Sequence, residues 1–151
     1  MFYVILIIEI RELIPCIYQG VMLVGKQANK LCNLYIPNSK LDWMNYKIDR
    51  KQDLTFHHIV KRENGGKAVI ENGALLTHNA HNYLHVIEFK EIETYNYINK
   101  MFEIINKQLH EPTSDQRFVI EYLLRQFEDR HRYDVNSKGK PLIKQEWLKR
   151  W

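Results

Sequence analysis

The sequence predicts one small α+β domain, and two stretches of the chain carry this prediction. Residues 54–60, LTFHHIV, have the period-two pattern and β-branched character of a strand. Residues 89–109 instead repeat apolar side chains at spacings of three and four, which is the period of an amphipathic helix. A length of 151 residues suits one hydrophobic core rather than two large ones.

Composition limits the class of protein. The apolar share of 45% and the charged share of 26% are those of an ordinary globular chain, and the net charge of +4 permits a polyanionic partner without requiring one. Cys16 and Cys32 form no CxxC pair, and nothing suggests a disulfide framework, which favours the reducing cytoplasm. Residues 1–8 are apolar, but charged residues interrupt them far short of the roughly 20 residues that a membrane span needs. We expect a cytoplasmic protein that does not bind membranes.

The N-terminal boundary of the domain stays open. Residues 1–21 form an uncertain extension, which either packs on the domain as a strand or short helix or precedes a natural start at Met22. We expect residues 22–151 to be the single domain and a chain starting at Met22 to fold. Residues 22–36 suggest a short helix, and residues 36–53 are polar and rich in turn-forming side chains.

The segment 54–88 combines extended and helical patterns. A loop over residues 61–66 follows the first strand, because its Asn-Gly-Gly sequence readily adopts positive φ. Residues 67–76 predict a second short extended piece with a turn near Asn72, and from residue 79 onward the pattern becomes helical.

The C-terminal third predicts α-helices over residues 89–133. The first carries one apolar stripe, formed by Ile92, Tyr95, Ile98, Phe102, Ile105 and Leu109, which we interpret as core. His110, Glu111 and Pro112 end it.

Thr113 and Gln116 then form a capping box that opens another helix, with Phe118, Tyr122 and Phe127 expected to face inward. The basic tail either frays or lays Trp147 and Trp151 against a surface.

Five of the seven histidines lie between residues 57 and 85. His57 and His58 are neighbours in a strand, so their side chains point to opposite faces and serve different purposes. His81 and His85 are separated by four residues in a helix, a spacing that holds one cation from a single face. One strand histidine can complete a three-imidazole site while the other acts on a water molecule. Three protein ligands with open positions describe a catalytic metal site rather than a structural one.

Residues 54–85 resemble the HNH, or His-Me finger, nuclease motif. The paired histidines followed by isoleucine, the glycine pair in the loop, Asn72 before a short apolar run and the helical His81-Asn-Tyr-Leu-His85 occur in the order of that family. The pattern is most similar to that of the colicin-type DNase domains. The resemblance implies a ββα-metal fold, in which strand, loop, strand and helix hold a divalent cation between them.

The resemblance also implies a role for each of these residues. His58 would be the general base that activates water, and Asn72 would fix the loop that orients it. Three histidines would bind a divalent cation such as Mg²⁺, Mn²⁺, Ni²⁺ or Zn²⁺, and these are His57, His81 and His85. Lys61, Arg62 and Lys67 flank the site, either as a solvated charged loop or as phosphate contacts.

One departure from the family is visible. Many HNH proteins carry two CxxC pairs that bind a structural zinc, but here Thr77 and Ala80 stand where the second pair would be. We expect the packing of the C-terminal helices to replace that zinc.

The resemblance predicts a stand-alone HNH endonuclease that hydrolyses DNA phosphodiester bonds, of the kind found in phage, mobile elements, or restriction and defence systems. The first alternative is a catalytically silent His-Me finger that serves as a nucleic-acid-binding or regulatory module. The second is a structural zinc protein, which is disfavoured because structural zinc sites usually use cysteine.

Overall fold

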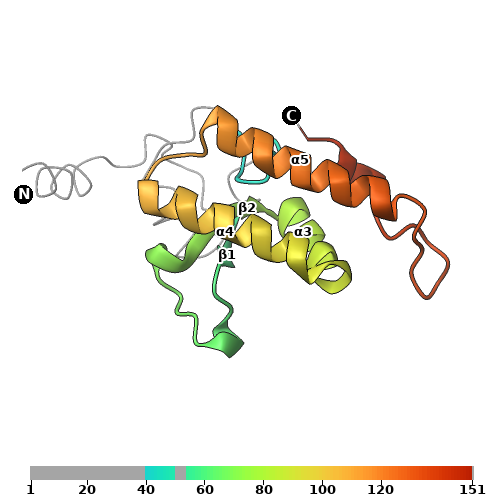
Figure 1. Ribbon diagram of the computed structural model, residues 1–151, viewed down its shortest axis with the longest axis horizontal. Helices are drawn as coiled ribbons and strands as arrows, with labels where there is room; N and C mark the ends of the chain where they lie inside the picture. The colour runs from blue at the N-terminus through green and yellow to red at the C-terminus, as the bar shows by residue number, and fades with distance from the viewer. Residues whose placement is uncertain (1–39, 50–53, 151) are drawn as a thin grey trace, which may run out of the picture.

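The computed structural model describes residues 40–49 and 54–150, and it confirms the mixed α+β class. Within this part of the chain, an antiparallel two-stranded sheet packs with three α-helices (Figure 1). The elements are β1 (Leu54–His58), β2 (Gly73–Thr77), α3 (His78–Lys90), α4 (Ile92–Gln108) and α5 (Ser114–His131), with 3₁₀ turns η2 (Arg62–Asn64), η3 (Ile70–Asn72) and η4 (Gln145–Leu148). None of the helices described is both long and apolar enough to cross a membrane. The expectations for residues 1–36 lie outside the described residues.

The two strands run antiparallel with Leu54 opposite Thr77 and His58 opposite Gly73. The chain passes from β2 into α3 without a linker, because Thr77 ends the strand and also caps the helix by accepting a hydrogen bond from the Ala80 amide at 3.2 Å. α3 therefore begins beside the first residue of β1 and brings its own first turns over that strand. The loop between the strands extends away from the helices (Figure 1).

The core lies between the sheet and the three helices. All five residues of β2 are buried, and apolar side chains of all three helices belong to the same core cluster. The largest buried side chains are Trp43, Tyr83, Phe102, Phe127, Met44, Leu54, Leu75, Leu76, Leu84, Ile87 and Ile98. Two of these, Trp43 and Met44, come from the segment that the sequence marks as polar and turn-rich.

A buried carboxylate holds that segment in the core. Asp42 accepts hydrogen bonds from the backbone amides of Met44 (2.8 Å) and Tyr46 (2.9 Å). It also accepts from the amide and hydroxyl of Thr77, at 2.7 and 2.9 Å. Burial raises the pKa of Asp42 to about 6, and these four hydrogen bonds act in the opposite direction. Asp42 thus fastens the β2–α3 junction at Thr77.

The expected helix over residues 89–109 is interrupted at its start. α3 ends at Lys90 and α4 begins at Ile92, because Glu91 between them adopts a non-helical conformation with φ −142° and ψ 85°. The Glu91 carboxylate accepts two hydrogen bonds of 2.7 Å from the Arg130 guanidinium on α5 and lies 2.7 Å from His131 Nε2. The middle of the predicted stripe is buried as expected, whereas its end residues Ile92 and Leu109 are exposed.

α5 begins with the predicted capping box, in which Thr113 and Gln116 exchange side-chain and backbone hydrogen bonds. The prediction of its inward face is wrong at two of three positions. Phe127 is buried, but Phe118 and Tyr122 are 71% and 55% exposed. The buried face instead consists of Arg117, Ile120, Glu121, Leu124 and Phe127. Its charged members are tolerated because they bind partners far away in the sequence.

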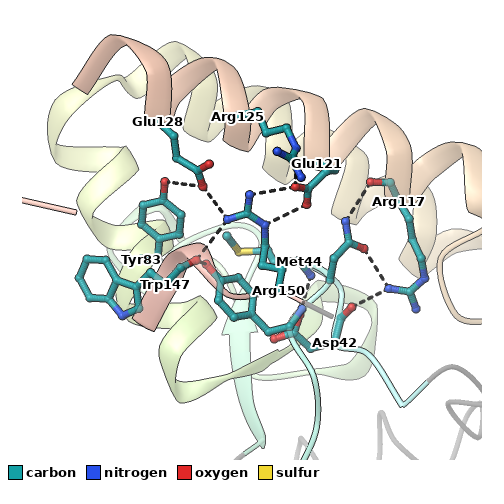
Figure 2. Close-up of polar contacts among 11 residues, drawn as sticks. Asp42, Met44, Tyr83, Arg117, Glu121, Arg125, Glu128, Trp147 and Arg150 are labelled. Atoms are coloured by element: carbon teal, nitrogen blue, oxygen red, sulfur yellow. Dashed lines mark hydrogen bonds and ion pairs between the residues drawn. The ribbon is translucent and has the colours of Figure 1, made fainter. Parts of the chain in front are cut away.

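Arg150 is the main partner of Glu121 on that face (Figure 2). Its guanidinium donates to both carboxylate oxygens of Glu121 at 2.9 Å, to Glu128 at 2.5 Å and to the Trp147 carbonyl at 3.2 Å. Trp147 is buried and stacks on Tyr83 of α3, with ring centroids 5.3 Å apart. The tail therefore packs on α3 and α5 as far as residue 150, and Trp151 lies outside the described residues.

We predict that Arg150→Leu lowers the free energy of unfolding by about 3–5 kcal/mol, because it leaves the buried carboxylate of Glu121 and the half-buried carboxylate of Glu128 without their shared cation. Urea denaturation measures the change. Arg132→Leu is the matched control, since Arg132 pairs with Asp129 at the surface and its loss costs less than about 1 kcal/mol. Equal losses in the two variants would contradict the structural role given to Arg150.

Candidate active site

A pocket of about 300 Å³ lies where the end of β1, the following loop, α3 and the start of α4 meet. Its lining consists of His57, His58, Lys61, Arg62, Glu63, His81, His85 and Tyr95. All four histidines that the sequence singles out are therefore in one place, and three charged loop residues lie beside them.

His57 is buried at the base of this pocket, and its hydrogen bonds determine which ring nitrogen carries the proton. Its Nε2 lies 2.8 Å from Oδ1 of Asn99 on α4, while Nδ2 of the same amide donates to the Tyr95 carbonyl at 3.2 Å. Reversing the amide would bring two oxygens together, so Asn99 presents its oxygen to His57. Neutral His57 therefore carries its proton on Nε2 and has a lone pair on Nδ1.

His81 is held in the complementary way by Thr55. The Thr55 hydroxyl donates its one hydrogen to the Leu76 carbonyl at 3.0 Å, and its oxygen lies 2.9 Å from His81 Nδ1. That oxygen must act as the acceptor, which places the proton of neutral His81 on Nδ1 and a lone pair on Nε2.

The two lone pairs face each other, because His57 Nδ1 lies 3.4 Å from His81 Nε2. Burial lowers the pKa of His57 to about 3 and that of His81 to about 4, so neither ring carries a second proton near pH 7. Two facing lone pairs repel each other unless a cation lies between them. Two nitrogens bound to a tetrahedral ion at about 2.0–2.1 Å lie roughly 3.3–3.4 Å apart, so the pair fits a metal such as zinc.

His85 lies beside this pair but does not converge on it. Its ring stacks on His81 with centroids 5.0 Å apart, and its Nδ1 lies 3.1 Å from Glu88 Oε2. The proton of neutral His85 is therefore on Nδ1, facing Glu88, and Nε2 carries the lone pair. In the part of the chain that the structure describes, no three His, Cys, Asp or Glu side chains form a group that could hold an ion. The three-histidine site therefore stays a prediction.

His58 follows His57 in β1, and the two side chains leave the strand in different directions. Both nevertheless line the pocket. Its ring is half-buried on the loop side, packs edge-on against Phe56 and lies with Nε2 3.4 Å from Arg62 Nε. Burial, followed by the positive charge of Arg62, lowers the pKa of His58. The ring is consequently neutral near pH 7. Its Nε2 accepts the long hydrogen bond from Arg62 Nε and is therefore the unprotonated, basic nitrogen of the neutral ring.

Asn72 closes the loop that carries these charges. Its side chain accepts from the Val60 amide at 2.7 Å and donates to the carbonyls of Val60 and Lys67 at 2.8 and 3.0 Å. Gly66 is required nearby, because a Cβ there would collide with the Val60 carbonyl. Asn72 thus joins Val60 and Lys67, the two ends of this loop.

The three basic loop residues differ in their surroundings. Lys61 forms an ion pair with Glu88 of α3, which also contacts His85. Arg62 and Lys67 are exposed, with Arg62 at the pocket rim. Lys61 therefore connects the loop to α3, while Arg62 and Lys67 can reach an anion.

Sequence reasoning did not find Thr55, Glu88, Tyr95 and Asn99 as members of the site. Tyr95 and Asn99 belong to α4, where the apolar stripe indicated core alone. The available signal was a buried asparagine beside that stripe, which needs a hydrogen-bond partner.

We predict that Asn72→Ala loosens the loop, because three side-chain hydrogen bonds worth roughly 1 kcal/mol each are lost. Hydrogen exchange of the Val60 amide should become faster by at least about tenfold. Asn64→Ala, at an exposed position of the same loop, is the control and should leave that rate unchanged. Identical exchange in both variants would show that Asn72 does not hold the loop.

No family model, curated protein or solved structure matches this chain. The resemblance to the HNH family rests on residues 54–85 alone. Over residues 54–90, the structure has a strand, a loop, an antiparallel strand and a helix in succession.

Proposed function

We propose that this protein is a metal-dependent endonuclease of the HNH, or His-Me finger, type that hydrolyses DNA phosphodiester bonds. His58 is the general base, and His57, His81 and His85 are the ligands of a divalent cation. The ββα-metal motif is formed by β1, β2 and α3.

The observation that carries the proposal is the pair of facing lone pairs on His57 Nδ1 and His81 Nε2, 3.4 Å apart. Each opposite ring nitrogen has an oxygen acceptor, as is usual for histidines that bind metals. His85 is one helical turn from His81 with an exposed side chain, so a change of rotamer brings its Nε2 toward the same ion.

The chemistry needs a base near the ion that is not consumed as a ligand. His58 meets this requirement, because it lines the same pocket and its lowered pKa keeps the ring neutral near pH 7. It would take the proton of the attacking water. A bound cation would polarise the phosphoryl group and stabilise charge on the leaving oxygen.

Charge at the pocket rim supports an anionic substrate. Arg62 is exposed and lines the pocket, Lys67 is exposed on the same loop, and the chain carries a net charge of +4. Both residues would contact backbone phosphates, which position a nucleic acid without reading its sequence.

We predict that purified protein nicks plasmid DNA only when a divalent cation is added. His58→Ala should slow cleavage by about 10²–10⁴-fold and keep metal affinity, because the base does not touch the ion. His81→Ala should lose both, with partial recovery at high metal concentration. Plasmid nicking and calorimetric metal titration, run with Mg²⁺, Mn²⁺, Ni²⁺ and Zn²⁺, measure the two properties.

His110→Ala is the matched control, since His110 is exposed and lies outside the pocket. It should retain cleavage and metal affinity. Metal binding without cleavage would favour the silent binding module instead. If His58→Ala lost metal affinity as severely as His81→Ala, the division between base and ligands would be wrong.

DNA binding should weaken with salt, because each neutralised phosphate releases counterions. Arg62→Gln and Lys67→Gln should each reduce the slope of log affinity against log salt by about one unit or less. Lys138→Gln, an exposed lysine outside the pocket, is the control and should leave the slope unchanged. Salt-insensitive binding would contradict this prediction.

A further inference from the structure

Among the described residues, Asn99 makes the one hydrogen bond to the His57 side chain that comes from outside the ββα segment. It lies on α4, is 7% exposed, and holds its amide oxygen 2.8 Å from His57 Nε2. The Tyr95 carbonyl fixes the direction of that amide.

The contact matters because His57 has a competing way to satisfy its ring. If its proton moved to Nδ1, that nitrogen could donate directly to His81 Nε2, 3.4 Å away. Such a hydrogen bond would use both lone pairs at once and close the pocket to a cation. The oxygen of Asn99 favours the tautomer with the proton on Nε2 of His57. With the proton on Nδ1, that buried oxygen would face an unprotonated Nε2 and lose its hydrogen bond.

We infer that Asn99 is a positioning residue, which keeps His57 in the Nε2–H tautomer so that Nδ1 is the atom that binds the cation. Thr55 of β1 plays the same part for His81: its oxygen keeps the proton on Nδ1 and leaves the lone pair on Nε2. The tautomer assignment is independent of the proposed function. Only the statement that the bound species is a divalent cation rests on it.

The first experiment reads the tautomer in the full-length, metal-free protein by ¹⁵N NMR of labelled histidines at about pH 8, where the rings are neutral. His57 should carry its proton on Nε2 in the wild type and in Asn99→Asp, which keeps an oxygen acceptor. Asn99→Leu should move the proton to Nδ1.

Asn106→Leu is the matched control. Asn106 lies on the same helix, is 6% exposed, and donates to the carbonyls of Ile70 and Gly73 rather than to a histidine. This variant should lose thermal stability and keep the wild-type tautomer, so the tautomer is a readout that a merely structural role would not move.

The second experiment is calorimetric titration of the same variants with Zn²⁺. Asn99→Leu should bind about 10–100-fold more weakly than the wild type, which is the usual effect of removing the partner of a ligand histidine. Asn99→Asp should restore affinity to within a few-fold, and Asn106→Leu should keep it.

Two results would overturn the inference: a wild-type His57 protonated on Nδ1, or an equal loss of affinity in Asn99→Leu and Asn106→Leu. A wild type with the Nε2–H tautomer but without affinity for any divalent cation would overturn the proposed function and leave the tautomer assignment standing.

Discussion

Four hydrogen bonds converge on the buried carboxylate of Asp42, and the arrangement of the whole domain depends on them. They join the segment around residues 42–46 to Thr77, where β2 becomes α3. The backbone carbonyl of Asp42 also accepts a hydrogen bond of 2.8 Å from Arg117 of α5. One residue therefore fixes the start of α3, and with it the direction in which His81 and His85 project over β1.

The site follows from that geometry. Antiparallel pairing places Thr55 opposite Leu76, so one hydroxyl contacts both the second strand and His81 of α3. α4 then packs beside α3 and supplies Asn99 to His57. One helix, α4, and one strand, β1, thus each fix one ring nitrogen, and the two remaining nitrogens, His57 Nδ1 and His81 Nε2, face each other. If the proposed function is right, a divalent cation between these nitrogens would offset the repulsion of their lone pairs.

The sequence was informative where a pattern is local. The strand 54–58, the helical spacing of His81 and His85 and the capping box at Thr113 each involve neighbours along the chain. It was misleading on α5, where Phe118 and Tyr122 are exposed and Glu121 is buried, because Glu121 is neutralised by Arg150, 29 residues away. Asn99 was missed for the same reason: its partner His57 lies 42 residues earlier. Partners that meet only in three dimensions leave no periodic signal.

Anomalous diffraction from a crystal soaked in Zn²⁺ tests the central claim most directly, since it locates the ion without reference to activity. We predict one strong peak between His57 Nδ1 and His81 Nε2, about 2.0–2.1 Å from each. Rotation of His85 toward the same peak would complete the three-histidine site. Absence of a peak there at saturating Zn²⁺, with the two nitrogens still 3.4 Å apart, would contradict the account.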